Sequence, residues 1–292
     1  MEYAAQILIL GFLSGAVFAS VSFGFSMVFG VLNIVNFAHG LFILLGAFIL
    51  YSFTEAIGIN PFILLPLSAI SVGLFGYCLQ RFVINRVMEQ SIPMVLLLTL
   101  GISLSITEAV KMIWGHEEIF VRVIKGGQES FLLGGIYFPW ISVYVFFATA
   151  IATVFFFLIL NKTEMGMAIR ACRDNVESAK LVGIDTNRIY NFTTAIAGAW
   201  TGVAGAMVVT LEVMPPEGAM SWLLVAFVVT IIGGLGSMAG VLLGGFLIGL
   251  VSSLCSGYIN PGWINAILYG LLVVMLIIKP TGILGVAEAQ KR

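Results

Sequence analysis

Charged residues are scarce in this chain. Lysine, arginine, aspartate and glutamate make up only 9% of the 292 residues, whereas soluble domains usually carry about 25%. Hydrophobic residues make up 60%, in continuous runs close to the roughly 20 residues that cross a bilayer as a helix. Strands of a membrane barrel would instead alternate apolar and polar residues over about 10 positions. The composition therefore predicts a polytopic, all-α membrane protein.

Cysteine and histidine are also rare. The three cysteines, Cys78, Cys172 and Cys255, are scattered, whereas a disulfide framework or a metal site needs clustered pairs. The two histidines, His39 and His116, are far apart, and His116 falls in a predicted external loop. We therefore expect inert thiols and no metal site.

Sequence signatures of catalysis are missing. The only Lys-Thr pair, Lys162-Thr163, follows Asn161 where a phosphate-binding loop requires glycine. There is no GxSxG nucleophile, and no basic patch interleaved with aromatics that would suggest nucleic acid. The N-terminus carries Glu2 and no basic stretch, so we expect the first apolar run to remain as a span. We predict no catalytic residue and no cofactor in this chain.

The apolar runs predict about nine transmembrane helices in one domain covering 1–292. The run at 221–235 is short, so eight or ten crossings also fit. Glycines spaced by four recur in the runs, which is typical of closely packed membrane helices. The runs lie at about 5–30, 34–53, 61–80, 93–113, 139–160, 190–212, 221–235, 238–256 and 263–279.

The basic residues predict the orientation. Ten of the thirteen fall on alternating breaks, after the third and fifth runs and at the C-terminal end. The other three lie in the 111–138 loop among several glutamates. Cytoplasmic loops carry the excess of lysine and arginine, so the N-terminus is expected outside and the C-terminus in the cytoplasm.

Two apolar regions are interrupted by glycine and polar residues, at 30–40 and at 233–240. Interrupted segments in corresponding positions of two halves are typical of transport sites. Asn36 suits an N-cap, and a helix beginning inside the membrane presents unpaired N–H groups that attract a carboxylate. An amide carbonyl would fit such a site as well. The candidate translocation residues are Asn33, Asn36, Phe37, His39, Gly40, Gly234 and Gly236. Alternatively, the same residues form only a tight turn between two spans.

Glu108 lies near the outer end of the fourth run, with Lys111 three residues later. This spacing favours an ion pair on one helix face. A proton-coupling carboxylate is the alternative, since acids inside membranes are costly and often functional.

The most charged segment lies at 164–185, and five of the thirteen basic residues lie in it or beside it. A membrane protein that concentrates charge in one loop is expected to offer that loop to a soluble partner. The alternative is a loop that is merely solvated.

Five motifs follow one another along the chain. They are Asn33-Ile-Val-Asn36-Phe-Ala-His39-Gly40, Gly166-x-Ala-Ile-Arg170-Ala, Glu177-Ser-Ala-x3-Gly183-Ile-Asp185, Ile232-Gly-Gly-Leu-Gly236-Ser-x-x-Gly240 and Lys279-Pro-Thr-Gly-Ile-Leu-Gly285. In this order they resemble the permease subunit of branched-chain amino-acid ABC importers, specifically the shorter of the two permeases.

The resemblance implies a multi-pass protein of the bacterial inner membrane. Its implied partners are a second homologous permease, two P-loop ATPases that carry ATP and Mg²⁺, and an external substrate-binding protein. The segment 162–189 would be the coupling loop that docks on an ATPase. In its Glu-Ala-Ala motif the middle position is Ser178, a residue small enough to keep close contact with the ATPase. The coupling residues are then Arg170, Arg173, Asp174, Glu177, Ser178, Ala179, Gly183 and Ile184.

Relatives in the wider family import leucine-type amino acids, other amino acids, amides or urea, so urea or a short amide is the alternative to a branched-chain amino acid. An autonomous secondary transporter or channel is a more remote alternative. It would need acidic residues deep in the spans, and most spans lack them.

Overall fold

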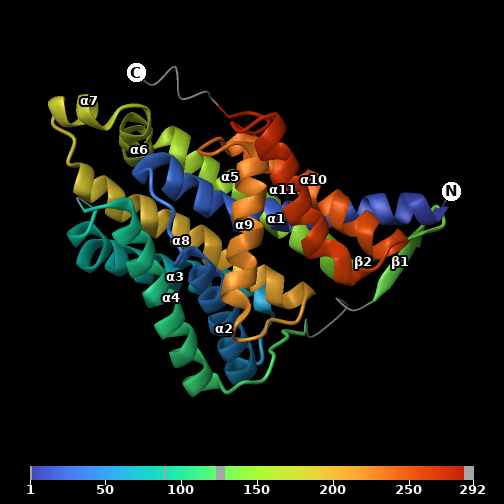
Figure 1. Ribbon diagram of the computed structural model, residues 1–292. Helices are drawn as coiled ribbons and strands as arrows, with labels where there is room; N and C mark the ends of the chain where they lie inside the picture. The colour runs from blue at the N-terminus through green and yellow to red at the C-terminus, as the bar shows by residue number, and fades with distance from the viewer. Residues whose placement is uncertain (1, 89, 123–128, 286–292) are drawn as a thin grey trace.

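The computed structural model describes residues 2–88, 90–122 and 129–285, and it is almost entirely helical (Figure 1). The helices and strands are α1 (Glu2–Leu32), α2 (His39–Ile57), α3 (Pro61–Phe82), η1 (Ile84–Arg86), α4 (Ile92–Trp114), β1 (Ser130–Leu133), β2 (Ile136–Pro139), α5 (Trp140–Lys162), α6 (Glu164–Asp174), α7 (Val176–Leu181), α8 (Thr186–Leu211), α9 (Gly218–Gly233), α10 (Met238–Tyr258), η2 (Pro261–Trp263) and α11 (Ile264–Ile278).

Eight spans are long and apolar enough to cross a membrane, when η1 is counted with α3 and η2 with α11; α9 is a shorter apolar helix of 16 residues. The predicted polytopic helical architecture is therefore confirmed for the part of the chain that the structure describes, with a number of spans inside the expected range of eight to ten. The short run that left the count open corresponds to α9.

The bundle has two distinct ends. Figure 1 shows α6 and α7 at one end, while the N-terminus and the β1–β2 hairpin lie at the opposite side. We call these the α6–α7 end and the hairpin end. The hairpin pairs Ser130 with Pro139 and lies in a loop where we predicted no strands. Its second strand is held to α1 by Gln6, which exchanges hydrogen bonds of 2.6 and 2.7 Å with the backbone of Tyr137.

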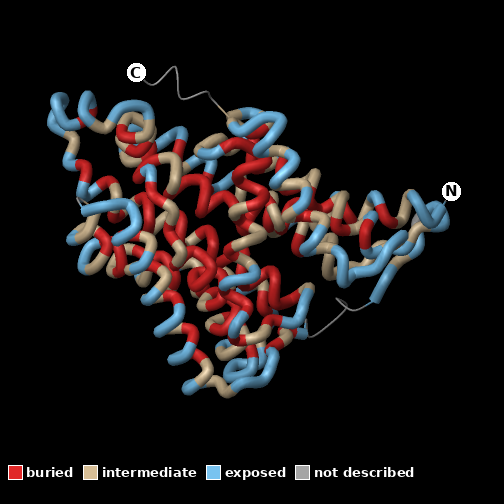
Figure 2. Tube along the Cα trace, viewed as in Figure 1, coloured by how far each residue is buried: buried red, intermediate tan, exposed pale blue. Residues whose placement is uncertain are grey.

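The core lies where α8 crosses α2 and α3. Figure 2 shows the buried residues gathered in the middle of the bundle. Gly202 packs against Val72 and the carbonyl of Ser68 on α3, and an added Cβ at Gly205 would overlap the carbonyl of Ile43 on α2. Small residues let helix backbones approach closely, so the predicted role of the glycine spacing in helix packing is confirmed here.

A second glycine seam joins α1 to α10. The Cβ position of Gly15 lies 2.8 Å from the Cα of Phe246, and that of Gly245 lies 2.6 Å from the Cα of Ala19. Gly249 packs in the same way against Gly11 and Gly15. The N-terminal and C-terminal parts of the chain are thus held together over most of α1.

Alanine at Gly46 should destabilise the protein. Gly46 faces the backbone of Gly202, and its Cβ position lies 2.7 Å from the Cα of that residue. Overpacking of this kind costs about 1–3 kcal/mol, so the apparent Tm in detergent should fall by several degrees. Gly101→Ala is the matched control, because no atom lies within 4 Å of its Cβ position. It should be neutral or slightly stabilising. Equal Tm values for the two variants would contradict the packing described.

Candidate translocation and coupling sites

The first interruption links α1 to α2. Helix α1 ends at Leu32, and the exposed Asn33 follows in a left-handed conformation with φ of 54°. Helix α2 begins only at His39, so the expected N-cap at Asn36 is wrong. Residues 36–38 form a turn instead, in which Oδ1 of Asn36 accepts the backbone N–H of Ala38 at 2.9 Å. Ala38 is already in the helical region, so the turn leads directly into the first residue of α2.

This turn lies deep in the bundle. Nε2 of His39 is 2.9 Å from the carbonyl oxygen of Val21, which precedes the end of α1 by eleven residues. At 1.5 Å per residue, the start of α2 lies about 16 Å inside the C-terminal end of α1. On the other side, the N–H of Phe37 donates to Oγ1 of Thr99 on α4 at 3.2 Å. The chain therefore re-enters the bundle before α2 starts, as the discontinuous-segment prediction requires.

The polar groups at this turn are buried. Asn36 is 2% exposed and His39 is 1% exposed. Nδ2 of Asn36 and Nδ1 of His39 have no hydrogen-bond partner among the described residues. Gly40 packs on the backbone carbonyl of Ala219, at the start of α9. A buried polar atom without a partner costs about 1–3 kcal/mol of folding free energy. Packing alone therefore does not account for the two unpaired polar groups at this turn.

The second interruption links α9 to α10. Gly234 and Gly236 take φ of 113° and 74°, a region that favours glycine. Oγ of Ser237 accepts the N–H of Gly240 at 3.1 Å and caps α10.

The Lys279–Gly285 motif lies on this second interruption. The N–H groups of Ile283 and Leu284 donate to the carbonyls of Ile232 and Gly233 at 2.8 and 2.9 Å. Sequence reasoning did not pair these two motifs. Their shared glycines were the available signal, because Gly282 and Gly285 pack directly on Gly234.

The two interruptions meet at the α6–α7 end. The Cβ position of Gly30, just before the first motif, lies 3.0 Å from the Cα of Gly236 and 3.8 Å from Cδ of Arg173. The predicted translocation residues are therefore divided between two places. Gly234 and Gly236 lie at the α6–α7 end, whereas Asn36, Phe37, His39 and Gly40 lie deeper.

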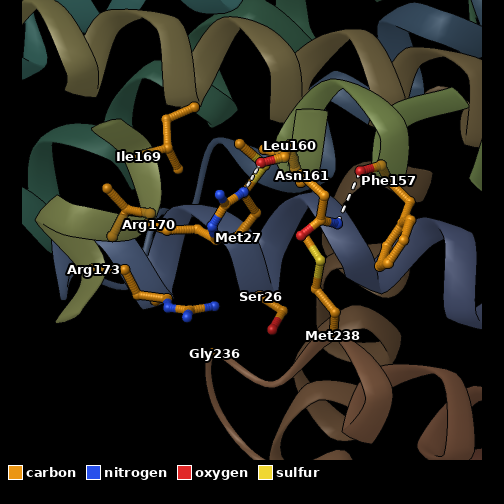
Figure 3. Close-up of a pocket in the computed structure, with 12 residues that line it drawn as sticks. Ser26, Met27, Phe157, Leu160, Asn161, Ile169, Arg170, Arg173, Gly236 and Met238 are labelled. Atoms are coloured by element: carbon orange, nitrogen blue, oxygen red, sulfur yellow. Dashed lines mark hydrogen bonds between the residues drawn. The ribbon is translucent and has the colours of Figure 1, made fainter. Parts of the chain in front are cut away.

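A cavity of about 120 Å³ opens beside this junction. Figure 3 shows the side chain of Arg173 extending towards Ser26, with Gly236 below them. Oγ of Ser26 is buried and has no partner among the described residues. Arg170, on the same helix as Arg173, donates to the carbonyl of Leu160 at the end of α5. This inner cavity thus joins α1, α5, α6 and the α9–α10 turn.

The charged segment forms two short helices. Thr163 caps α6 through a bond of 3.1 Å to the N–H of Gly166, and Asn175 caps α7 through one of 2.8 Å to Ser178. Helix α6 packs on the bundle through Gly166, Ile169 and Cys172. Burial raises the pKa of the Cys172 thiol, which therefore stays protonated and unreactive at neutral pH.

The predicted coupling residues differ in exposure. Asp174, Glu177, Ser178 and Gly183 are exposed, whereas Arg170, Arg173 and Ile184 are partly buried. Ala179 is buried and faces the protein.

Sequence reasoning missed the most exposed apolar pair in this segment. Leu181 is 89% exposed and Val182 is 76% exposed, and Gly183 follows them with φ of 86°. An apolar pair directly before a glycine, inside a charged loop, was the signal available in the sequence.

Glu108 and Lys111 form the expected ion pair on α4. Nζ of Lys111 lies 2.7 Å from Oε1 of Glu108. The Glu108 side chain is 62% exposed, so the pair contributes little to stability.

The chain is similar in sequence to known transport permeases. A family model described as "Branched-chain amino acid transport system / permease component" matches residues 7–277. The permease protein BraD of a high-affinity branched-chain amino acid transport system from Pseudomonas aeruginosa is 26% identical, over 98% of this chain and 97% of its own. LivH, a permease protein of the same description from Escherichia coli K12, is 26% identical over 99% and 98% of the two chains. A probable branched-chain amino acid permease LivH from Methanocaldococcus jannaschii is 27% identical over 91% and 88%. No solved structure matches the chain.

The family model covers most of the chain, from the first turns of α1 to the last turn of α11. The resemblance based on the five motifs is thus confirmed. The eight long apolar helices agree with a multi-pass protein of the cytoplasmic membrane. This chain belongs to the permease family of branched-chain amino acid ABC transport systems.

Proposed function

We propose that this chain is the shorter permease of an ATP-driven importer and that its substrates are branched-chain amino acids. The observation that carries the proposal is the exposed apolar tip on α7, formed by Leu181 and Val182 before Gly183. Exposed apolar side chains in a charged setting mark protein contact sites. The tip lies at the C-terminal end of α7, at the α6–α7 end of the bundle (Figure 1). The substrate follows the names of the relatives, none of which concerns urea or an amide.

The α6–α7 end is then the cytoplasmic end, with the N-terminus outside and the C-terminus inside. Lys162, Arg170, Arg173, Lys180 and Arg188 all lie in or beside α6 and α7, as the positive-inside rule requires. The segment 162–189 is the coupling loop. Its exposed carboxylates, Asp174 and Glu177, offer charge pairing around the apolar tip.

Coupling runs from α7 through α6 to the inner cavity. Arg170 ties α6 to α5, and Arg173 reaches Gly30 beside Gly236. A shift of α6 therefore moves the junction at which both interruptions meet. Deeper in the bundle, Asn36 and His39 supply the polar groups of the translocation path, which opens when α2 and α9 separate at Gly40 and Ala219.

This chain has no catalytic role in the proposal. ATP and Mg²⁺ bind the two partner ATPases, and this chain holds no cofactor. A second homologous permease and an external binding protein complete the importer, and the lipid bilayer surrounds it.

Gentle purification from the native membrane tests the assembly. Mass spectrometry should identify a second permease and two P-loop ATPases with this chain. ATP hydrolysis by the purified complex should rise when the substrate-loaded binding protein is added. A stable homo-oligomer that purifies without any ATPase would contradict the coupling assignment and favour a channel or a secondary transporter.

A further inference from the structure

A second cavity opens at the hairpin end, on the side of the bundle opposite the inner cavity. Its volume is about 490 Å³, within the roughly 300–1,000 Å³ typical of small-molecule sites. It lies between the N-terminal half of α1, the C-terminal end of α8, the first half of α9, and the facing ends of α10 and α11. We call it the outer cavity. In the proposed orientation it opens towards the external binding protein.

Glu212 carries the only charge among the described residues that line the outer cavity. It is exposed to solvent and directly follows the last residue of α8. The C-terminal end of a helix presents unpaired carbonyl groups and the negative end of the helix dipole. Leu211, the last residue of this 26-residue helix, also lines the cavity. The carboxylate and the helix end therefore act together, and both favour a cation.

Hydroxyl groups line the same cavity, and that of Ser252 is buried without a hydrogen-bond partner among the described residues. Ser14, Ser253 and Ser256 donate to backbone carbonyls, at 3.2, 2.8 and 2.9 Å. Ser252 is only 8% exposed, and its Oγ has no partner among the described residues. A buried hydroxyl that lines a cavity and is left unpaired points to a polar ligand.

Apolar side chains form the rest of the wall. Phe18 comes from α1, Trp222 from α9 and Leu268 from α11. A cavity with a few polar groups and a largely apolar wall suits a ligand with one charged end and one hydrocarbon end. A branched-chain amino acid has this form, whereas urea and short amides carry neither the positive charge nor the branched hydrocarbon chain.

We propose that the outer cavity binds the α-ammonium group of the incoming amino acid, with Glu212 as its counter-charge and Ser252 as a hydrogen-bonding group. The inference rests on the proposed function and deepens it, because it assigns the ammonium-selective site of the permease. A lipid headgroup with a primary ammonium offers the same chemistry, and the test below separates the two sources.

The test uses the complete importer in vesicles of phosphatidylcholine and phosphatidylglycerol, which have no primary ammonium. Uptake of L-leucine is measured at saturating binding protein. Glu212→Gln removes the charge and keeps the shape, and should reduce uptake roughly fivefold, the upper end for a charge pair at a solvent-exposed site. Glu212→Asp keeps the charge and should retain most of the uptake.

Glu217→Gln is the matched control. Glu217 is an exposed acid at the start of α9, five residues away, and does not line the cavity. It should transport like the unmodified complex. Ser252→Ala should reduce uptake by a smaller factor than Glu212→Gln.

Three results would overturn this inference alone. The first is normal uptake by Glu212→Gln, and the second is an equal loss of uptake in Glu217→Gln. The third is a loss in Glu212→Gln that is seen only when phosphatidylethanolamine is added to the vesicles, which would assign the ammonium group to a lipid. An unmodified complex that moves no amino acid would overturn the proposed function itself.

Discussion

Replacing Gly183 with valine is expected to separate ATP hydrolysis from uptake. Gly183 has φ of 86°, and apart from its chain neighbours no atom of the described residues lies within 4 Å of its Cβ position. The substitution therefore fits sterically but forces a β-branched residue into a left-handed conformation, at a cost of about 1–2 kcal/mol. The turn should relax and move Leu181 and Val182, which precede it. A change of 1.4 kcal/mol in docking corresponds to about tenfold in affinity, so we expect leucine uptake to fall roughly tenfold or more.

The measurement compares uptake with ATP hydrolysis in the same vesicles, after checking that the chain is inserted at normal levels. Gly58→Val is the control. Gly58 has φ of 71° and an equally open Cβ position, but it ends α2 far from α7. It should show the same backbone strain and normal coupling. Full uptake by Gly183→Val would remove α7 from the coupling assignment.

Asn36→Leu is expected to impair uptake while the importer still assembles. The change removes the Oδ1 acceptor that closes the turn before α2 and the buried Nδ2 group beside it. Without the acceptor, the N–H of Ala38 is left unpaired in a buried site, at a cost of about 1–3 kcal/mol. The turn also loses its polar groups at the point where we place the translocation path. We expect uptake to fall about tenfold or more, with the ATPases still co-purifying.

Asn60→Leu is the control for this variant. Oδ1 of Asn60 accepts the N–H of Phe62 at 3.0 Å, at the exposed start of α3. As in Asn36, the side-chain oxygen accepts the backbone N–H of the residue two positions later. Its loss should lower stability by about 1 kcal/mol and leave uptake unchanged. If Asn36→Leu transports at the normal rate with unchanged substrate preference, the path does not pass this turn.

The helix N-caps show which features residue type alone can predict. The charged segment folds into two short helices, and their N-caps, Thr163 and Asn175, are residue types that favour this position. The N-cap of α2 was placed two residues too early, because Asn36 suits both a cap and a turn. Both roles use the same side-chain oxygen, and only the contacts of the turn with α1 and α4 select between them.

Hydrophobic runs and motifs were enough to assign the class of the protein, its helical membrane-spanning architecture, the ion pair on α4 and the family. These follow from hydrophobicity and residue spacing, which act over one or two helical turns. Tertiary structure decided which motifs meet. It placed Ile283 and Leu284 on the α9–α10 turn, Gly30 against Gly236, and Glu212 in a cavity with Ser252. Helix crossings set by glycine seams bring these residues together from distant parts of the chain, and one-dimensional spacing carries no record of such crossings.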